Sequence, residues 1–208
     1  MVYAEYAALV LFGYLLGAVP SALIAGKLLK GIDIRQYGSG NVGAANTLRT
    51  LGLGASVAVF ASDIIKAAAP VLLARWLTGE PAVEVAVALA AIAGHNWPVY
   101  IGWRGGRGVS SSFGALVVFS PLVAAICVVF FVAVVALTRY VSLGSLAGSV
   151  LGCLLILGLA LWSLLPPAYA AYAVLGAALI VIQHRDNISR LVRGTERKLG
   201  QRVTTPSS

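Results

Sequence analysis

The stretch VSSSFGALVVFSPLVAAICVVFFVAVVAL, residues 109–137, decides the fold of this chain. It carries no charged residue, and Ser120-Pro121 interrupts it near its middle. If this stretch forms one helix, the whole chain crosses a membrane six times. As two helices of about 12–14 residues each, turning at Ser120-Pro121, it gives seven crossings. Helices that short would be tilted or only partly inserted, with neighbouring helices covering their ends.

The composition places the chain in a membrane. Of its 208 residues, 60% are hydrophobic and only 11% are charged, and the mean hydropathy is +0.93. Soluble domains are about 45–50% apolar and about 25% charged, which excludes a soluble enzyme, a disordered chain and a fibrous protein. At about 20 apolar residues per crossing, the length leaves no room for a separate soluble domain. We therefore expect one transmembrane domain over residues 1–200 and a polar tail over 201–208.

The basic residues choose between six and seven crossings. The other apolar runs cover residues 3–26, 51–77, 83–101, 143–165 and 168–182. The first run lacks the basic segment of a signal peptide, so we expect it to be retained. With seven crossings, one face holds 13 of the 15 basic residues, namely Lys27, Lys30, Arg35, Arg49, Arg104, Arg107, Arg139, Arg185, Arg190, Arg193, Arg197, Lys198 and Arg202. The positive-inside rule then favours an all-α protein with seven transmembrane helices, two of them short, the N-terminus outside and the C-terminus in the cytoplasm.

Cysteine and charge usage exclude several classes of site. Cys127 and Cys153 lie inside apolar runs, so they predict neither a disulfide nor a metal centre. The net charge of +8 comes from residues in the breaks between apolar runs. This placement favours membrane lipids and small anionic ligands as partners, not nucleic acid. No motif implies a cofactor.

The first candidate motif is the loop GSGNVGAANTLR, residues 38–49. Its glycines free the backbone to turn several N–H groups toward one anion, and its polar side chains and arginine add hydrogen bonds and charge. The candidate residues are Ser39, Gly40, Asn41, Asn46, Thr47 and Arg49. The alternative is a flexible turn between two helices, but such turns are seldom this rich in Gly, Ser and Asn beside an arginine.

The second candidate motif lies in GHNWPVYIGWRGGRGVSSS, residues 94–112. Glycines, a basic side chain and hydroxyls stand at the start of a helix, where backbone N–H groups and the helix dipole favour an anion. The candidate residues are Gly105, Gly106, Arg107, Gly108 and Ser110. The spacing is not that of a P-loop, and the alternative is a basic anchor at the membrane interface. His95 is as compatible with a structural role at a helix end as with catalysis.

The third candidate motif opens the C-terminal tail. His184 and Asn187 are three residues apart, so they share a face of a helix where the last apolar run meets the cytoplasm. The alternative is an interfacial helix that binds anionic lipid headgroups. That alternative accounts for the basic residues Arg190, Arg193, Arg197 and Lys198, but it does not account for the paired His and Asn.

Asp63 and Lys66 are charged residues in the middle of an apolar run. Charges at that depth are costly and are usually functional. Three residues apart, they could also neutralise each other as a structural pair, which we favour slightly over contact with a substrate. Composition and spacing together indicate an integral membrane protein that acts on anionic phosphorylated substrates at the cytoplasmic surface.

These motifs resemble, in order and spacing, those of the bacterial acyl-phosphate:glycerol-3-phosphate acyltransferases of the PlsY type. The resemblance rests on GSGNVGAANTLR, GHNWPVYIGWRGGRGVSSSFG, TRYVSLGS and HRDNISRLVRGTERKLG, and it extends to about residue 200. It implies seven helices in the bacterial cytoplasmic membrane and transfer of a fatty acyl group from acyl phosphate to the 1-hydroxyl of glycerol 3-phosphate. The products would be lysophosphatidate and phosphate, in the first committed step of phospholipid synthesis.

The resemblance also implies residue roles. Ser39, His184 and Asn187 would be catalytic. The resemblance and the motifs above together give Ser39, Gly40, Asn41, Arg49, Gly105, Gly106, Arg107, Gly108 and Ser110 as the predicted phosphate ligands. The residues themselves, without the resemblance, give Asn46, Thr47, Asp63, Lys66, His95 and Glu196 as the predicted supporting residues. Two positions depart from the family: Arg107 replaces the usual lysine, and Ala45 replaces a frequent threonine, with Thr47 as the nearest hydroxyl that could compensate. Either His184 or the departing phosphate could accept the proton.

A small transporter or channel for an organic phosphate is the alternative function. The mid-span Asp63 and Lys66 and the interrupted stretch 109–137 would suit it. A transporter, however, needs polar groups at the midplane with access from both sides. Here most polar groups gather at one face, which favours the enzyme.

Overall fold

The computed structural model describes residues 2–201, which form helices and turns with no β-strand. The helices are α1 (Val2–Gly17), α2 (Ser21–Lys30), α3 (Ala44–Leu51), α4 (Leu53–Thr78), α5 (Pro81–Asn96), α6 (Val109–Phe119), α7 (Pro121–Thr138), α8 (Val141–Leu161), α9 (Ala168–Gln183) and α10 (Arg185–Val192), with 3-10 turns at Ile34–Gln36 and Val99–Ile101. Arg202 and the rest of the predicted tail beyond Gln201 lie outside the described residues, and the division into one domain and a tail stays a prediction.

Long apolar helices confirm the predicted all-α integral membrane fold. Five segments are long and apolar enough to cross a membrane: Val2–Lys30, Leu53–Thr78, Pro81–Ile101, Pro121–Thr138 and Val141–Leu161. The bent pair α9 and α10 would make a sixth, and α6 is apolar but shorter. Seven crossings and their direction therefore stay predictions.

The stretch 109–137 folds as two helices that separate at Ser120. The Ser120 hydroxyl accepts a hydrogen bond from Val123 N at 3.4 Å, and Pro121 occupies the first turn of α7, where its missing N–H is no loss. The prediction of two short helices of similar length is wrong, because α6 has 11 residues and α7 has 18. Because Ser120-Pro121 divides the stretch unequally, α7 is long enough to cross and only α6 is short.

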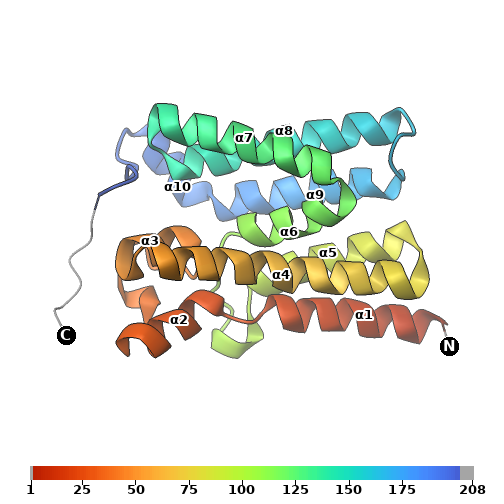
Figure 1. Ribbon diagram of the computed structural model, residues 1–208, viewed down its shortest axis with the longest axis horizontal. Coiled ribbons are helices and arrows are strands. Elements are labelled where there is room, and N and C mark those ends of the chain that lie inside the picture. The colour runs from red at the N-terminus through yellow and green to blue at the C-terminus, as the bar shows by residue number, and fades with distance from the viewer. Residues whose placement is uncertain (1, 202–208) are drawn as a thin grey trace.

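Two layers of long helices enclose α6 (Figure 1). In the layer of α1, α4 and α5, glycines bring α1 and α5 close together, since a Cβ on Gly17 would collide with the backbone of Ala91, and one on Gly94 with the backbone of Tyr14. The layer of α7, α8 and α9 lies on the other side, and α6 contacts α4, α5, α7 and α9. Protein therefore surrounds this short helix.

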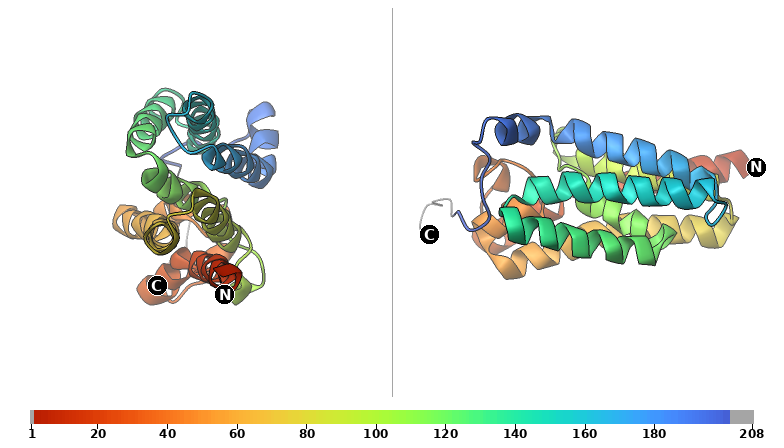
Figure 2. Two further views of the ribbon diagram at one scale, coloured as in Figure 1. Left: turned by 90° about the vertical axis from the view of Figure 1, so that its right-hand side faces the viewer. Right: turned by 90° about the horizontal axis from the view of Figure 1, so that it is seen from above.

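The two ends of the helix bundle differ. The short helices α2, α3 and α10 lie at one end, and the turn between α4 and α5 lies at the other, where α1 begins (Figures 1 and 2). Along the helices between these ends, large apolar side chains such as Leu122, Val129 and Leu154 are exposed, as expected for a surface that faces lipid. The end with α2, α3 and α10 carries the candidate motifs.

Candidate active site

Asn46 shapes the first loop. Its side chain is 1% exposed; its Nδ2 donates to three carbonyls of the preceding chain at 3.1 Å each, and its Oδ1 accepts from Ser39 N at 2.8 Å. Gly38 has a φ of 63°, and a Cβ there would collide with Asn46 Oδ1, so this turn requires glycine. Asn46 thus holds the loop.

His95 and Asn96 at the end of α5 support the second loop. Gly106 N donates to His95 O at 3.0 Å, and Gly105 N donates to Asn96 O at 3.2 Å. A Cβ on Gly106 would collide with the His95 ring and with Val42 O, so the loop backbone rests directly on these groups. Sequence segments that looked like separate motifs therefore form one unit.

Glu196 gathers the C-terminal motif. Its Oε1 accepts from Asn187 Nδ2 at 2.6 Å and from Ser142 Oγ at 2.8 Å, and its Oε2 accepts from Arg190 Nε at 2.7 Å. Burial raises the pKa of this carboxyl, but the hydrogen bonds outweigh burial and lower the pKa below its ordinary value. An ionised Glu196 therefore ties α10 to the start of α8.

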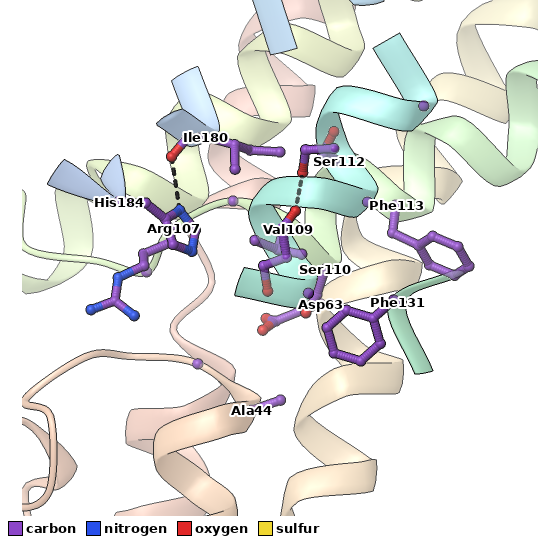
Figure 3. A pocket seen from close by; sticks show the side chains of 18 of the residues that line it. Ala44, Asp63, Arg107, Val109, Ser110, Ser112, Phe113, Phe131, Ile180 and His184 are labelled. Carbon is purple, nitrogen blue, oxygen red and sulfur yellow. Dashed lines mark hydrogen bonds between the residues drawn. The ribbon is translucent and has the colours of Figure 1, made fainter. Parts of the chain in front are cut away.

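His184 stands at the 62° bend between α9 and α10 and is 2% exposed. Its Nδ1 lies 2.8 Å from Ile180 O (Figure 3). Because a carbonyl can only accept, the proton of the neutral ring is on Nδ1, and Nε2 is the acceptor. His184 directly precedes α10, and Asn187 lies in the first turn of that helix.

An inner cavity of about 240 Å³ extends from the two loops into the helix bundle. Its polar end is lined by Ser39, Asn41, Gly106, Arg107, Gly108, Ser110 and His184. Its deeper part lies among α6, α7, α8 and α9 and is mainly apolar. Figure 3 shows Arg107 and His184 on one side, and the rings of Phe113 and Phe131 on the other.

An outer cavity of about 160 Å³ adjoins the inner one. Its lining residues are Gly38, Ser39, Ala45, Arg49, Arg107, Val141, Ser142, Asn187, Arg190, Glu196 and Arg197. Ser39, Ala45, Arg107 and Val141 line both cavities, so the cavities meet at these residues. Four arginines against one carboxylate make the outer cavity strongly positive.

Arg107 lies at the junction of the two cavities. With its amide oxygen turned to the guanidinium, Asn41 accepts from Arg107 Nε at 2.9 Å and from Nη2 at 2.6 Å. Burial and the charge of Arg190 lower the pKa of Arg107 to about 10, and burial and Arg197 lower the pKa of Arg49. Guanidinium groups crowded in this way favour an anion between them.

Asp63 and Lys66 form the predicted ion pair. Lys66 Nζ lies 2.8 Å from Asp63 Oδ1 and also donates to Val19 O at 2.8 Å, in the break between α1 and α2. Asp63 Oδ1 lies 3.7 Å from His95 Nδ1, and both residues border the inner cavity. The pair therefore connects the break in the first span to the support of the second loop, as expected of a structural pair.

Most predicted ligands converge on the two cavities, and a few do not. Gly40 and Gly105 are not among the residues that line either cavity. Thr47 does not replace the hydroxyl missing at Ala45, because Thr47 is fully buried and donates to Gly43 O at 3.1 Å. The suggested compensation by Thr47 is therefore wrong.

Sequence reasoning missed Ser142, Arg190 and Arg197, which line the outer cavity. The two arginines look like lipid-binding residues in the sequence. The spacing of three between Asn187 and Arg190 was the available signal for Arg190. Ser142 gives no local signal, because its partner Glu196 is distant along the chain.

Known proteins identify the family. The family model described as glycerol-3-phosphate acyltransferase matches residues 7–194. A glycerol-3-phosphate acyltransferase from Shouchella clausii is 47% identical over 94% of this chain and 96% of its own, and one from Halalkalibacterium halodurans is 45% identical over 95% and 97%. This chain belongs to the glycerol-3-phosphate acyltransferase family. It is therefore a membrane acyltransferase.

Solved structures agree with this membership. A crystal structure of PlsY, an integral membrane glycerol 3-phosphate acyltransferase in its glycerol 3-phosphate form, matches this acyltransferase with a TM-score of 0.88. The two chains are 36% identical, and the match covers 94% of this chain and 96% of that one. The lysophosphatidic acid form of PlsY matches with a TM-score of 0.86. The fold is therefore that of a multi-pass membrane enzyme.

Proposed function

We propose that this acyltransferase moves a fatty acyl group from acyl phosphate to the 1-hydroxyl of glycerol 3-phosphate, releasing lysophosphatidate and inorganic phosphate. The observation that carries the proposal is the pair of adjoining cavities that share Arg107. One cavity continues into an apolar interior, and the other is lined by four arginines. An amphiphilic donor and a small anionic acceptor require two such sites side by side. The reaction is the first committed step of phospholipid synthesis.

The inner cavity suits acyl phosphate. Its apolar part among α6, α7, α8 and α9 takes the acyl chain. Its polar end presents the first turn of α6, where backbone N–H groups point outward, together with Ser110 and Arg107. A helix N-terminus of this kind binds phosphate through its unpaired N–H groups and its dipole. The outer cavity then takes glycerol 3-phosphate, with Arg49, Arg190 and Arg197 on its phosphate.

Acyl transfer between these sites requires only the two substrates. The glycerol oxygen attacks the acyl carbonyl carbon, the bond from that carbon to the phosphate oxygen breaks, and the hydroxyl proton leaves on the departing phosphate. Asn187 Oδ1 is buried and has no hydrogen-bond partner within residues 2–201, so it can accept from the glycerol. His184 Nε2 accepts from the reacting 1-hydroxyl until its proton passes to the departing phosphate, Asn187 accepts from the other hydroxyl of the glycerol, and Arg107 stabilises the charge that develops on the phosphate.

For the location, we propose seven helices in the bacterial cytoplasmic membrane, with both cavities at the cytoplasmic face. The basic helices α2, α3 and α10 lie together at one end of the bundle, which supports this orientation. In a background without Cys127 and Cys153, Glu80→Cys should react with an impermeant reagent in intact cells. Thr195→Cys should react only after the cells are opened. The reverse pattern would overturn the orientation.

A phosphate transporter has less support. Transport needs access to the site from both sides of the membrane. The inner cavity instead ends among Leu116, Cys127 and Tyr172, which are all buried. The mid-span charges Asp63 and Lys66 neutralise each other.

The deciding experiment uses purified protein and labelled glycerol 3-phosphate. Acyl phosphate, acyl-CoA and acyl carrier protein are supplied as separate donors, and lysophosphatidate is measured. We expect turnover with acyl phosphate and not with acyl-CoA, because the inner cavity fits one phosphate and a chain. Efficient turnover with acyl-CoA alone would contradict the proposal.

Two variants test the residue roles. His184→Ala and Asn187→Ala should each lower kcat by about 10²–10³ while the protein remains folded in the membrane. Arg193→Ala is the matched control, because Arg193 is exposed just after α10 and lines neither cavity. Near-normal rates for both variants would remove His184 and Asn187 from the site.

A further inference from the structure

The inner cavity ends on a floor of packed side chains. Leu116, Cys127 and Tyr172 line its deep end, and the ring of Phe119 packs against Tyr172 with centroids 4.7 Å apart. The ring of Phe119 also packs against Tyr169, with centroids 4.3 Å apart. None of these five residues is more than 8% exposed. The cavity therefore has a closed lower end.

Hydrogen bonds fix this floor. Tyr172 OH donates to Ser112 O at 2.6 Å, and Tyr169 OH donates to Glu84 Oε2 at 2.8 Å. Moving either ring would leave buried polar groups without partners. The rings of the floor therefore do not swing aside readily to admit a longer ligand.

Gly148 widens the cavity above the floor. Gly144, Gly148 and Gly152 recur every four residues and line the cavity from one face of α8. A Cβ on Gly144 would lie 2.7 Å from the Val135 side chain, and one on Gly152 would lie 3.2 Å from Cys127 Sγ, so these two glycines serve close packing. A Cβ on Gly148 would meet no atom nearer than 3.9 Å. A side chain at 148 would therefore fit without collision at its Cβ, beside Cys127 and Phe131, and would occupy part of the cavity that Gly148 lines.

We propose that the floor formed by Leu116, Cys127 and Tyr172, together with the space at Gly148, sets the longest acyl chain that the enzyme accepts. This inference rests on the proposed function, because it places the acyl chain in the inner cavity. His184 and Tyr172 are 12 residues apart along α9, which corresponds to a depth of about 18 Å. An acyl chain with its carbonyl near His184 extends down to the floor.

A different path for the chain would make the floor irrelevant. Phe60 and Val128 line the same cavity, and each is 40% exposed on the lipid-facing surface. A chain that turned outward between them would end in the bilayer. It would then respond neither to the floor nor to a side chain at 148.

The experiment measures kcat/KM for a series of acyl phosphates of increasing chain length, at saturating glycerol 3-phosphate. Gly148→Val should shift the preferred chain to shorter lengths, with a loss of about tenfold for the longest chain that the wild type uses well. Leu116→Ala should shift the preference to longer chains. Where Leu116→Ala fails to fold, Cys127→Ala makes the same test with a smaller change. Gly158→Val is the matched control, because Gly158 lies on α8, lines neither cavity and has open space at its Cβ.

The outcomes separate this inference from the proposed function. Opposite shifts for Gly148→Val and Leu116→Ala, with the wild-type profile for Gly158→Val, would support the floor as the length gauge. If the variants are active and keep the chain-length profile of the wild type, the floor does not set the chain length, and the proposed function is unaffected. A wild type that uses no acyl phosphate of any length would overturn the proposed function itself.

Discussion

Arg75 and Arg107 are both half-buried arginines, but at opposite ends of the bundle they have opposite surroundings. Arg75 donates from Nε and Nη2 to Glu84 at 3.1 and 2.8 Å, from Nη2 to Tyr169 at 2.9 Å, and from Nη1 to Val118 O at 2.9 Å. Its charge is matched by Glu84. This arginine joins α4 to α5, α9 and the end of α6.

Arg107 has a different set of neighbours. Its hydrogen-bond acceptor is the neutral amide of Asn41, and Arg49 and Arg190 add to its charge. The nearby Glu196 already accepts from Arg190. The comparison teaches that a matched arginine holds helices together, whereas arginines in excess of their acids form a site for an anion. Removing each arginine should therefore affect a different property.

The largest effect is expected for Arg107→Gln. The variant removes a charge from the junction of the two cavities, so kcat/KM should fall by about 10²–10³. The melting temperature should not fall, because burial and then the charge of Arg190 lower the pKa of Arg107, so its positive charge does not stabilise the fold. Activity and thermal unfolding of the purified protein measure the two properties. A destabilised variant with normal kcat/KM would reverse the comparison.

Arg75→Gln should show the opposite pattern. It leaves the buried Glu84 carboxylate without its cation and should cost about 1.5–3 kcal/mol of stability. The kcat/KM of the folded fraction should change far less than in Arg107→Gln, because Arg75 lines neither cavity. Adding Glu84→Gln should recover part of the loss, since no unpaired buried charge remains. A double variant less stable than Arg75→Gln would contradict this account.

A smaller effect is expected for Arg107→Lys, and it depends on pH. The ordinary pKa of lysine, about 10.4, is about two units or more below that of arginine. Burial and the neighbouring charges lower the pKa of Arg107 to about 10. The same surroundings would lower the pKa of a lysine ammonium at this position below its ordinary value. The cation is present below its pKa and is lost as the pH rises through it. The alkaline fall in kcat/KM should therefore begin at lower pH in Arg107→Lys than in the wild type, and identical pH profiles would contradict this prediction.

The sequence predicts which residues form the site at the end with α2, α3 and α10 better than it predicts how these residues contact one another. Ser39, Arg107 and His184 follow from dense local motifs, because glycine, hydroxyl and basic residues close together in the chain rarely have another use. Seven of the nine predicted phosphate ligands line the cavities, while Gly40 and Gly105 do not. The sequence names Asn46 and His95 as supporting residues, but which loop atoms each one holds depends on the contacts made after folding.

The features that the sequence does not predict depend mainly on contacts between residues far apart in the chain. Glu196 meets Ser142 across 54 residues, and no periodicity connects them. The unequal split of 109–137, by contrast, can be read from the sequence, because Ser120-Pro121 leaves a shorter segment before it than after it. Arg75 and Glu84 look like ordinary charges near a helix turn, so their link to Val118 and α6 appears only in the structure.

The smallest effect is expected for Ala45→Thr. This variant sharpens the comparison because it adds a hydrogen-bond donor to the anion-binding end. Ala45 lines both cavities at the first turn of α3. Ala45→Thr should lower KM for glycerol 3-phosphate about threefold to tenfold, the net worth of one added hydrogen bond, while kcat stays near that of the wild type. Ala45→Val has the same shape without the hydroxyl and is the matched control. If Val improved KM as much as Thr does, packing would explain the gain, and the cavities would need no further donor.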